Sequence, residues 1–358
     1  MVADTLSWLE ANFSSEISFA KQKRKTRTVT KCKRQESEPY VFPISPKVIA
    51  KKQTTDKYLL RQLHKGITEK FSTIQLEGVS LTTINGSIYV PQELQHKIVA
   101  WYHQYLAHPG QSRMEATIRQ NFTWPNIRDH VKTFCAACPQ CQINKRQRKK
   151  YGHLPAKEAE YLPWECVKVN LIGPYTVRTT EDSTQELRAL TMIDPATRWF
   201  ETSPIPDKSA VTVMTAFNND WLCRYPQPCY IRFNNGSKFK AEFLETCTNY
   251  GVKAKVTTSH NPQANAGIIE WVHQVLGNSL RTLDIANKQL ETTDTWRSIL
   301  SEVAFAIRST YHTTLEATPG QLVFGCNMIL PVSFTPNALG PNQETETSLN
   351  WQKYTTRK

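Results

Sequence analysis

Residues 103–110, HQYLAHPG, and residues 135–142, CAACPQCQ, are the part of the sequence that decides the fold. The first segment holds two histidines with four residues between them, and 29 residues after the second histidine the other segment supplies a cysteine pair two residues apart. Two imidazoles and two thiolates complete a tetrahedral zinc site, and the two-residue gap lets one turn present both sulfurs to the ion. The spacing therefore predicts a structural zinc site made by His103, His108, Cys138 and Cys141.

This spacing leaves two alternatives open. Cys135 and Cys138 are also two residues apart, so the cysteine pair could be the earlier one, although Pro139 and Gln142 favour the later pair. Alternatively, the histidines are ordinary surface or hydrogen-bonded core residues, and the cysteines are small buried residues without a metal.

Positive charge is concentrated in two short blocks. The 358 residues contain 44 Lys and Arg against 31 Asp and Glu, which gives a net charge of +13. Residues 21–34 hold eight cations and residues 145–150 hold five, with no acid in either block, so the rest of the chain is balanced. Such blocks indicate a polyanionic partner, nucleic acid before membrane, although a basic run can also be a solvated tail.

The cysteine count and the hydropathy argue against a disulfide-rich secreted protein and against a membrane-spanning one. Nine scattered cysteines, an odd number, favour reduced thiols over a disulfide scaffold. No apolar run approaches the roughly 18 residues of a membrane span, and Asp4 and Glu10 stand where a secretory signal has cations and then apolar residues. We expect a soluble intracellular protein, and a composition of 39% hydrophobic residues excludes full disorder.

The first part of the chain is predicted to hold a tail and a small mixed region. In residues 1–46 we expect a short helix over 1–12 followed by a disordered basic segment. Residues 47–91 contain helical segments and a β-hairpin, because Val79–Val90 alternates in polarity around Asn85-Gly86, the dipeptide typical of a type I′ turn.

The following region, residues 92–146, is predicted to be mainly helical. Amphipathic spacing indicates helices over residues 92–107, 114–122 and 127–134. A basic linker, residues 147–160, comes next and separates this region from the remainder of the chain.

Residues 161–330 are predicted to form an α/β domain. Strands are expected at Val167–Ile172, Leu187–Ile193, Trp199–Ile205, Tyr230–Phe233 and Val252–Val256. Helices are expected at Ala210–Cys223, Ala241–Tyr250, Gly267–Leu283 and Trp296–Tyr311, the first of them capped by Asp207. This order favours a mixed sheet covered by helices, followed by a polar tail over residues 331–358.

The zinc spacing is one of several motifs that occur in a fixed order. They are His103, His108-Pro109-Gly110, Phe122-x-Trp124-Pro125, Cys138-Pro-x-Cys141-Gln142 and Lys145. Together they closely resemble the zinc-binding domain of integrases of gypsy-type long-terminal-repeat retrotransposons and retroviruses, and the resemblance continues to about residue 330. It implies a small, mainly helical zinc-binding domain followed by a ribonuclease-H-like α/β core with a mixed five-stranded sheet. Val2–Ser7 also resembles the end of the ribonuclease H domain that precedes integrase in such polyproteins, although an ordinary helical N-terminus explains it as well.

The resemblance also implies a catalytic site. Integrases of this family hold two Mg²⁺ or Mn²⁺ ions with two aspartates and a glutamate, and the ions clamp the attacking and leaving oxygens of a phosphoryl displacement. The matching positions in this sequence are Asn170, Asn234 and Glu270, with the family's spacing of 35 residues between the last two. The chain thus keeps the family's spacing between the second and third positions, but asparagine replaces both aspartates.

An asparagine keeps the size of aspartate and one carbonyl oxygen but loses the negative charge. We therefore expect a folded core that binds divalent ions weakly. Three carboxylates elsewhere could be considered as substitutes, but none stands at a matching position, and we expect them to be solvated surface groups: Glu186, Asp194 and Asp220.

Other departures from the family share one mutational class. Lys238 stands where Glu is usual, and Trp271, Cys326 and Trp8 stand where Arg is common. Asp to Asn and Glu to Lys are G-to-A changes, and Arg to Cys or Trp are C-to-T changes. Our hypothesis is a decaying copy of the element, of the kind that cytosine deamination leaves.

Taken with the resemblance, these features predict DNA binding and DNA integration by descent, with 3′-end processing and strand transfer impaired. The alternative is a non-catalytic DNA-binding or scaffolding protein, and a third reading is a pseudogene product that is scarcely made. The resemblance implies DNA and further copies of the chain as partners, no membrane partner, a nuclear location, Zn²⁺ as structural cofactor and Mg²⁺ or Mn²⁺ as catalytic cofactor. The tail is too short for the family's C-terminal domain. The expected DNA-contacting residues are Lys145, Arg146, Arg148, Lys149 and Lys150, and Gln263, Asn265 and His273 could line a groove.

Overall fold

A computed structural model describes seven stretches of the chain. They are residues 42–65, 70–145, 161–178, 184–234, 242–257, 272–278 and 293–329. The predicted helix over 1–12, the basic block at 21–34, the linker and the tail lie outside these residues. No helix within the described stretches is long and apolar enough to cross a membrane.

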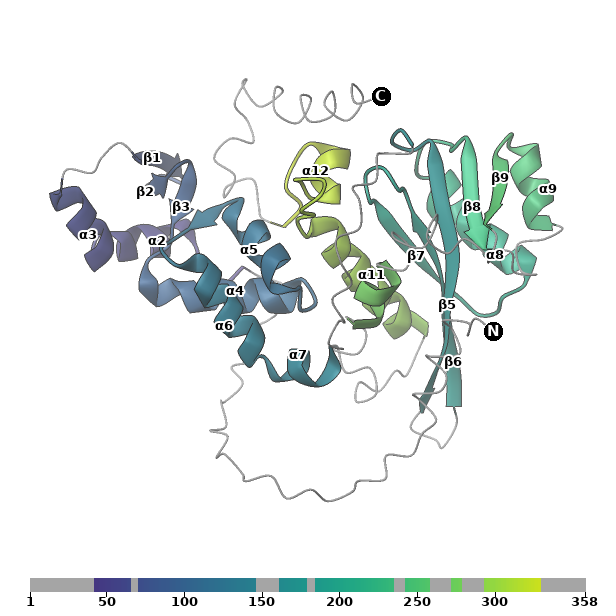
Figure 1. The fold of residues 1–358 in the computed structure, drawn as a ribbon, viewed down its shortest axis with the longest axis horizontal. Coiled ribbons are helices and arrows are strands. Elements are labelled where there is room, and N and C mark those ends of the chain that lie inside the picture. Colours follow the sequence, from purple (N-terminus) through teal and green to yellow (C-terminus); the bar gives the residue numbers. More distant parts are fainter. Residues whose placement is uncertain are drawn as a thin grey trace, which may run out of the picture. The chain divides into compact units, whose positions relative to one another are not determined.

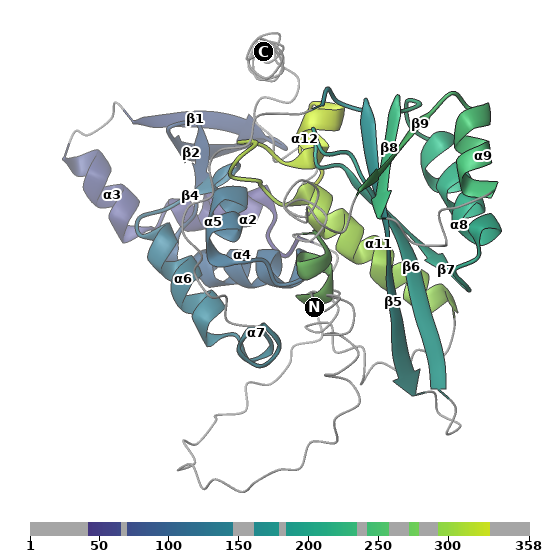
Figure 2. The ribbon, with the colours of Figure 1, turned by 45° about the vertical axis from the view of Figure 1, so that its right-hand side comes forward.

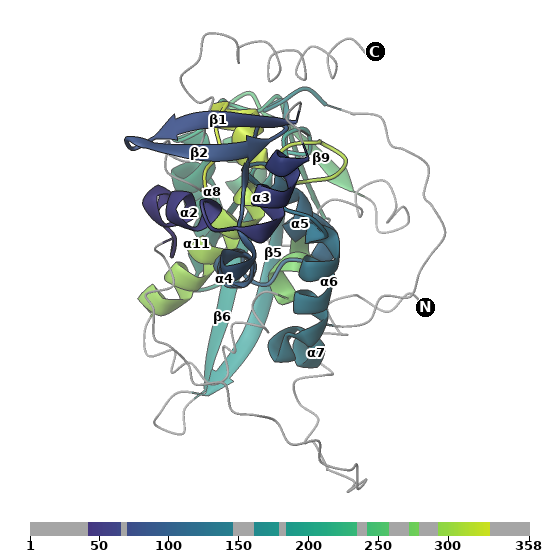
Figure 3. The ribbon, with the colours of Figure 1, turned by 90° about the vertical axis from the view of Figure 1, so that its left-hand side faces the viewer.

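The first sheet is built by local turns (Figures 1 and 3). Two helices, α2 (Pro46–Gln53) and α3 (Lys57–His64), precede β1 (Phe71–Leu76), β2 (Val79–Ile84) and β3 (Ser87–Tyr89). Asn85 and Gly86 adopt φ angles of 51° and 81°, the two positive values that a type I′ turn needs. Thr83 pairs with Ile88 across this turn, so the predicted hairpin is confirmed.

A second hairpin, between β1 and β2, was not expected from the sequence. Glu77 and Gly78 take φ angles of 48° and 74°, so they make the same kind of left-handed turn as Asn-Gly. The sheet is completed by β4 (Phe122–Thr123), which pairs in parallel with β3 from 33 residues further on and gives the order β1-β2-β3-β4. The sequence does not predict this hairpin, because Glu77 stands at the first turn position, where Asn and Asp are the residues usually found.

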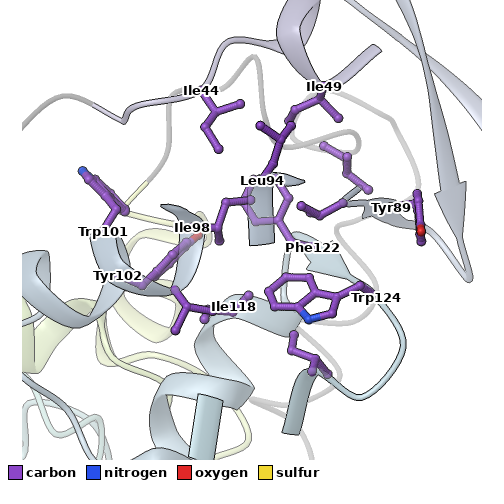
Figure 4. Packing of buried hydrophobic residues seen from close by; sticks show 14 of the residues in the cluster. Ile44, Ile49, Tyr89, Leu94, Ile98, Trp101, Tyr102, Ile118, Phe122 and Trp124 are labelled. Carbon is purple, nitrogen blue, oxygen red and sulfur yellow. The ribbon is translucent and has the colours of Figure 1, made fainter. Parts of the chain in front are cut away.

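Four helices follow the hairpin, and the first three of them bury one apolar core with it. They are α4 (Gln92–Tyr105), α5 (Gln111–Arg119), α6 (Ile127–Ala137) and α7 (Pro139–Asn144). Figure 4 shows side chains from α2, β3, α4, α5 and β4 pointing into this core, among them Ile49, Tyr89, Ile98, Ile118 and Phe122. The expected helical region therefore exists, but it shares its core with the segment before it.

The second sheet has five strands (Figure 2). They are β5 (Cys166–Arg178), β6 (Thr184–Ile193), β7 (Phe200–Ile205), β8 (Tyr230–Asn234) and β9 (Lys253–Thr257). The order is β7-β6-β5-β8-β9, in which β5, β6 and β7 pair antiparallel and β8 and β9 run parallel to β5. This is the ribonuclease-H-like arrangement that the resemblance implied.

Helices cover both faces of this sheet. Val167, Val169 and Leu171 of β5 pack with side chains of α8 (Ala210–Phe217) and α9 (Glu242–Asn249). Ile172 of β5 belongs instead to a cluster with α11 (Thr293–Ser309) and the helical residues 272–278. Because side chains alternate along a strand, Lys168 and Asn170 face the same side as Ile172.

Three local expectations need correction. Ser209, not Asp207, is the N-cap of α8: its side chain accepts a hydrogen bond from the N–H of Thr212, while Asp207 binds the N–H of Ser209. The expected helix over Ala210–Cys223 changes at residue 218 into a π-helical turn, η1 (Asn218–Leu222). A short helix, α12 (Pro319–Phe324), was not expected, although Thr318 and Gln321 form a capping box at its start.

Candidate metal centre and catalytic positions

Two helix ends and one turn bring four ligand-type side chains together. His103 lies in the last turn of α4, His108 in the turn that follows, Cys138 at the start of α7 and Cys141 within it. One ligand atom from each lies within 4.8 Å of the others. Sγ of Cys141 is 3.2 Å from Nε2 of His103, and Sγ of Cys138 is 3.5 Å from Nδ1 of His108.

The backbone after α4 is shaped to return His108 to the end of its own helix. Ala107 and His108 have φ angles of 51° and 60°, and the N–H of His108 binds the carbonyl of His103 at 2.8 Å. The ammonium of Lys145 donates to the carbonyls of His108 and Pro109. The reversal of the chain is thus fixed from both sides.

The donor set fits a zinc ion. With Zn–S and Zn–N bonds of about 2.3 and 2.0 Å at a tetrahedral angle, ligand atoms lie about 3.5 Å apart, close to the separations found here. Burial is the main cause that lowers the pKa of His103 to about 3 and that of His108 to about 4, and the charge of Lys145 acts in the same direction. Both imidazoles are therefore neutral near pH 7, which is the form that binds a metal.

Cys135, the alternative ligand, lies beside this group rather than in it. Its Sγ is 3.8 Å from Nδ1 of His103 and 3.8 Å from Sδ of Met114. These atoms are on the side of the His103 ring opposite to Nε2, which faces Cys141. Burial raises the pKa of the Cys135 thiol to about 11, so it stays protonated near pH 7.

Of the three catalytic positions, Asn170 is the one described with its side chain. It lies on β5 opposite Thr191 of β6. Oδ1 of Asn170 accepts a hydrogen bond of 2.8 Å from the N–H of Leu171, and its main-chain carbonyl accepts one of 3.0 Å from the Thr191 hydroxyl. The amide oxygen is thus engaged with the neighbouring backbone.

Asn234 is the last residue of β8, the parallel neighbour of β5. Lys168 pairs with Arg232, so continuing the register by two residues places the backbone of Asn234 level with Asn170. Glu270 lies outside the described residues, and the side chain of Asn234 is not described either. Two of the three predicted positions therefore lie on neighbouring parallel strands, each two residues beyond the Lys168–Arg232 pair.

His273 and Thr191 extend this site. Nε2 of His273 lies 3.0 Å from the Thr191 hydroxyl, which places the histidine beside the Asn170 position. Of the three residues expected near a groove, His273 is the described one, and Gln263 and Asn265 lie outside. Thr191 was missed because a threonine in an apolar strand carries no sequence signal until its cross-strand partner is known.

One of the three carboxylates expected at the surface is buried. Asp194 is 0% exposed and accepts hydrogen bonds from the N–H groups of Ala196 and Thr197 and from the Thr197 hydroxyl, so it closes the β6–β7 turn. Glu186 pairs with Arg188 and is half exposed, as expected. Asp220 pairs with Arg224 and also accepts from Ser203, and its side chain is mostly buried. Asp194 and Asp220 are therefore not free surface groups.

Of the remaining residues predicted from the sequence, some are described by the structure and others lie outside the described residues. Lys145 is among the described residues, and its ammonium donates a hydrogen bond to the main-chain carbonyl of His108, one of the four predicted zinc ligands. Cys326 is exposed. Other predicted positions lie outside the described residues: Trp8, Arg146, Arg148, Lys149, Lys150, Lys238 and Trp271.

Comparison with known proteins agrees with this geometry. Residues 90–147 match the integrase zinc-binding domain family. The chain is 24% identical over 297 residues to the Pro-Pol polyprotein of simian foamy virus type 3, covering 82% of this chain and 25% of that protein. It is 26% identical over 252 residues to human Gypsy retrotransposon integrase-like protein 1, covering 69% and 45%, respectively. A Pol polyprotein from Drosophila melanogaster transposon 412 is 25% identical over 229 residues, covering 63% of this chain and 18% of that protein.

Solved integrase structures are similar to parts of the chain. A simian T-cell lymphotropic virus intasome in complex with the PP2A regulatory subunit B56 gamma aligns with a TM-score of 0.39 and 17% identity, covering 65% of this chain and 76% of that one. The catalytic core of BIV integrase aligns with a TM-score of 0.34 and 16% identity, covering 44% and 93%. The chain spans a quarter of the foamy virus polyprotein and less than half of the human protein. The chain thus contains a segment, residues 90–147, that matches the integrase zinc-binding domain family, and it is similar over most of its length to gypsy retrotransposon integrase-like proteins and to the Pol polyproteins of foamy viruses and transposons.

Proposed function

We propose that this chain is a DNA-binding integrase by descent whose capacity for DNA integration is impaired at the metal site. The observation that carries the proposal is the pair of neutral amides, Asn170 and Asn234, on adjacent parallel strands where the family places two aspartates. Two divalent ions carry a charge of about +4 and are held by anionic oxygens. With Glu270 as the single family carboxylate left, Mg²⁺ or Mn²⁺ is held weakly.

The hydrogen bond within β5 supports the same conclusion. A metal ligand at position 170 needs an oxygen that points away from the strand, but Oδ1 of Asn170 accepts from the N–H of Leu171. An amide oxygen is also a weaker ligand for a hard cation than a carboxylate, because it carries no net charge. Metal binding would have to break this hydrogen bond, and a neutral amide would not offset its loss with the electrostatic attraction that a carboxylate gives.

Zinc has a separate, structural role in the proposal. His103, His108, Cys138 and Cys141 bind one Zn²⁺ and fix the end of α4 against α7. When bound, the ion supplies folding free energy and no catalytic chemistry, because a site closed by four protein ligands leaves no position for substrate.

The proposed partners are DNA and further copies of the chain, and the proposed location is the nucleus. Support comes from the block at residues 145–150 and the earlier block at 21–34, which together carry the whole net charge. Contacts of such cations with phosphates give affinity that does not depend on sequence and that falls with salt.

Strand transfer by the purified, zinc-loaded chain on model long-terminal-repeat ends with Mn²⁺ tests the proposal. We expect DNA binding with little or no joining. Joining at the rate of an intact integrase would contradict the impairment. Absence of DNA binding would contradict the whole proposal. DNA binding without any joining, even after both asparagines are changed to aspartate, would favour the alternative of a non-catalytic DNA-binding or scaffolding protein.

A further inference from the structure

One helix connects the zinc site to the end of the core. α5 begins directly after the turn that carries the second zinc histidine, with Gly110 as its N-cap. Met114, Thr117 and Gln120 follow at intervals of three residues, so each lies next to the preceding one on the helix surface. Sδ of Met114 is 3.4 Å from Nδ1 of His103. Thr117 and Gln120 contact the end of the core instead.

Thr117 is 0% exposed and binds the chain just beyond α11. Its hydroxyl accepts a hydrogen bond of 3.0 Å from the N–H of Tyr311 and donates one of 2.7 Å to the carbonyl of Arg113. A backbone N–H that is removed from water needs an acceptor, and here a side chain of α5 supplies it. The position of α5 therefore determines whether the first residues after α11 keep this hydrogen bond.

Gln120 binds residues on both sides of α12. Its Nε2 donates to Oε1 of Gln321 at 2.9 Å, and its Oε1 accepts from Nδ2 of Asn327 at 3.3 Å. The same Oε1 of Gln321 accepts from the N–H of Thr318 at 2.9 Å and so belongs to the capping box of α12. One side chain at the end of α5 is therefore hydrogen-bonded to the cap of α12 and to the turn after it.

Apolar contacts accompany these hydrogen bonds. Ile329, 8% exposed, belongs to the apolar core of the helical region, and the ring centres of Tyr105 on α4 and Phe305 on α11 are 5.8 Å apart. Apolar burial has no preferred direction, whereas a hydrogen bond weakens steeply as its angle and distance change. A small displacement of α5 would therefore break the hydrogen bonds first and leave the apolar contacts largely in place.

We propose that zinc occupancy controls, through α5, how firmly residues 311–327 are held at the end of the core. This inference rests on the structural role of zinc in the proposed function. With zinc bound, the turn at His108 fixes the start of α5, and α5 presents Thr117 and Gln120 to residues 311–327. Loss of zinc releases that turn and the contact of Met114 with the first zinc histidine. α5 then shifts, and the hydrogen bonds to the end of the core are lost while both apolar cores stay folded.

Hydrogen exchange of the full chain, with zinc and after chelation, tests the proposal. Chelation should speed exchange in residues 311–327, above all at the amides of Tyr311 and Thr318, by about fivefold for each hydrogen bond lost. Amides of β6 serve as the reference and should keep their rates. Zinc content is measured on every sample, so that loss of the ion and loss of the contact are recorded separately.

Two changes on α5 should remove the response to zinc. Thr117→Val with Gln120→Ala deletes the hydroxyl and the side-chain amide, so residues 311–327 should exchange faster even with zinc bound, and chelation should add little. Thr117→Ser keeps the hydroxyl and should keep the response. Gln104→Ala with Ser112→Ala is the matched control, because it removes an amide and a hydroxyl from exposed positions of α4 and α5. This control should respond to chelation as the unchanged chain does.

Three results would overturn the inference while the structural role of zinc stands. The first is a zinc-binding chain in which chelation leaves exchange at residues 311–327 unchanged. The second is an equal response to chelation in the unchanged chain and in Thr117→Val with Gln120→Ala, or in Gln120→Ala alone if the double variant does not fold. The third is a rise of equal size in β6, which would show general unfolding instead of coupling through α5. If the unchanged chain binds no zinc, the structural role of zinc and this inference both fail.

Discussion

The hydroxyl of Thr191 lies 3.0 Å from Nε2 of His273 and 3.0 Å from the main-chain oxygen of Asn170. A hydroxyl has one proton to donate, and the carbonyl of Asn170 can only accept, so Nε2 of His273 carries a proton and donates it to Thr191. Through Thr191 of β6, the neutral histidine therefore connects the helical residues 272–278 to β5 at the catalytic position of Asn170. The contact between Thr191 and His273 joins residues that are 82 positions apart in the sequence.

Acidification should destabilise the fold at this connection, because it places a positive charge on the buried imidazole of His273. Burial lowers the pKa of His273 to about 4, compared with 6.5 for an unperturbed histidine. Because the unfolded chain then binds more protons than the folded one, stability is complete above pH 6.5 and is lost progressively as the pH falls toward 4. The loss can reach about 1.4 kcal/mol per pH unit. Urea unfolding of the unchanged chain and of His273→Gln across this range would measure it. Parallel pH profiles for the two proteins would show that His273 does not titrate in this way.

Zinc removal should release the end of the helical region first. Cys141 and Cys138 fix α7, whose other side chains add little to the core, whereas α4 and α5 bury many apolar groups in the core shared with the first sheet. Zinc binding in small modules contributes roughly 10–16 kcal/mol. We expect a chelator to expose α7 and the turn at His108 to hydrogen exchange while β2 and β3 remain protected.

Substitution of single cysteines tests which cysteine pair binds zinc, Cys138 with Cys141 or Cys135 with Cys138. Cys141→Ser should abolish stoichiometric zinc, because it removes one of four ligands. Cys135→Ser should keep it, because Sγ of Cys135 lies on the far side of the His103 ring. A colorimetric zinc assay on the purified variants measures both. Equal loss of zinc from the two variants would contradict the ligand set of His103, His108, Cys138 and Cys141.

Lys145 should stabilise the zinc module rather than contribute mainly to DNA binding. Its ammonium donates to the carbonyls of His108 and Pro109, and a hydrogen bond from a charged donor contributes roughly 1.5–3 kcal/mol when buried. Because Lys145 is partly exposed, we expect Lys145→Gln to lower the free energy of unfolding by about 1 kcal/mol. Lys132→Gln, on the exposed side of α6, is the control and should change it by less than about 0.5 kcal/mol. Equal stability of the two variants would mean that the ammonium is free to meet DNA.

Features with a local cause could be predicted from the sequence. Asn85-Gly86 determines its own turn, and the spacing of His103, His108, Cys138 and Cys141 predicts a cluster because each pair lies on one turn or helix end. Contacts across the sheet could not be predicted in the same way. The burial of Asp194 depends on the turn between β6 and β7, and the pairing of β3 with β4 depends on how α4 and α5 fold between them.

The basic block at residues 21–34 should contribute to DNA binding through phosphate contacts. Its removal deletes eight cations. If most of them contact phosphates, the slope of log K against log salt should fall by several units, at about 0.9 for each contact. A variant in which the cations of this block are replaced by Gln, at unchanged length, separates charge from chain length. An unchanged slope in both variants would show that the block is a solvated tail.

Restoring the two aspartates should restore binding of Mg²⁺. Positions 170 and 234 each lie two residues beyond the Lys168–Arg232 pair of the parallel strands β5 and β8. We therefore expect Asn170→Asp with Asn234→Asp to add two carboxylates to one site together with Glu270. Each single change should restore much less, because two ions share these ligands. Calorimetric titration with Mg²⁺ and Mn²⁺ measures each step. Asn219→Asp with Asn249→Asp adds the same charge at exposed positions and should bind no better than the unchanged chain. If the doubly changed protein folds and still matches this control, positions 170 and 234 do not form the metal site.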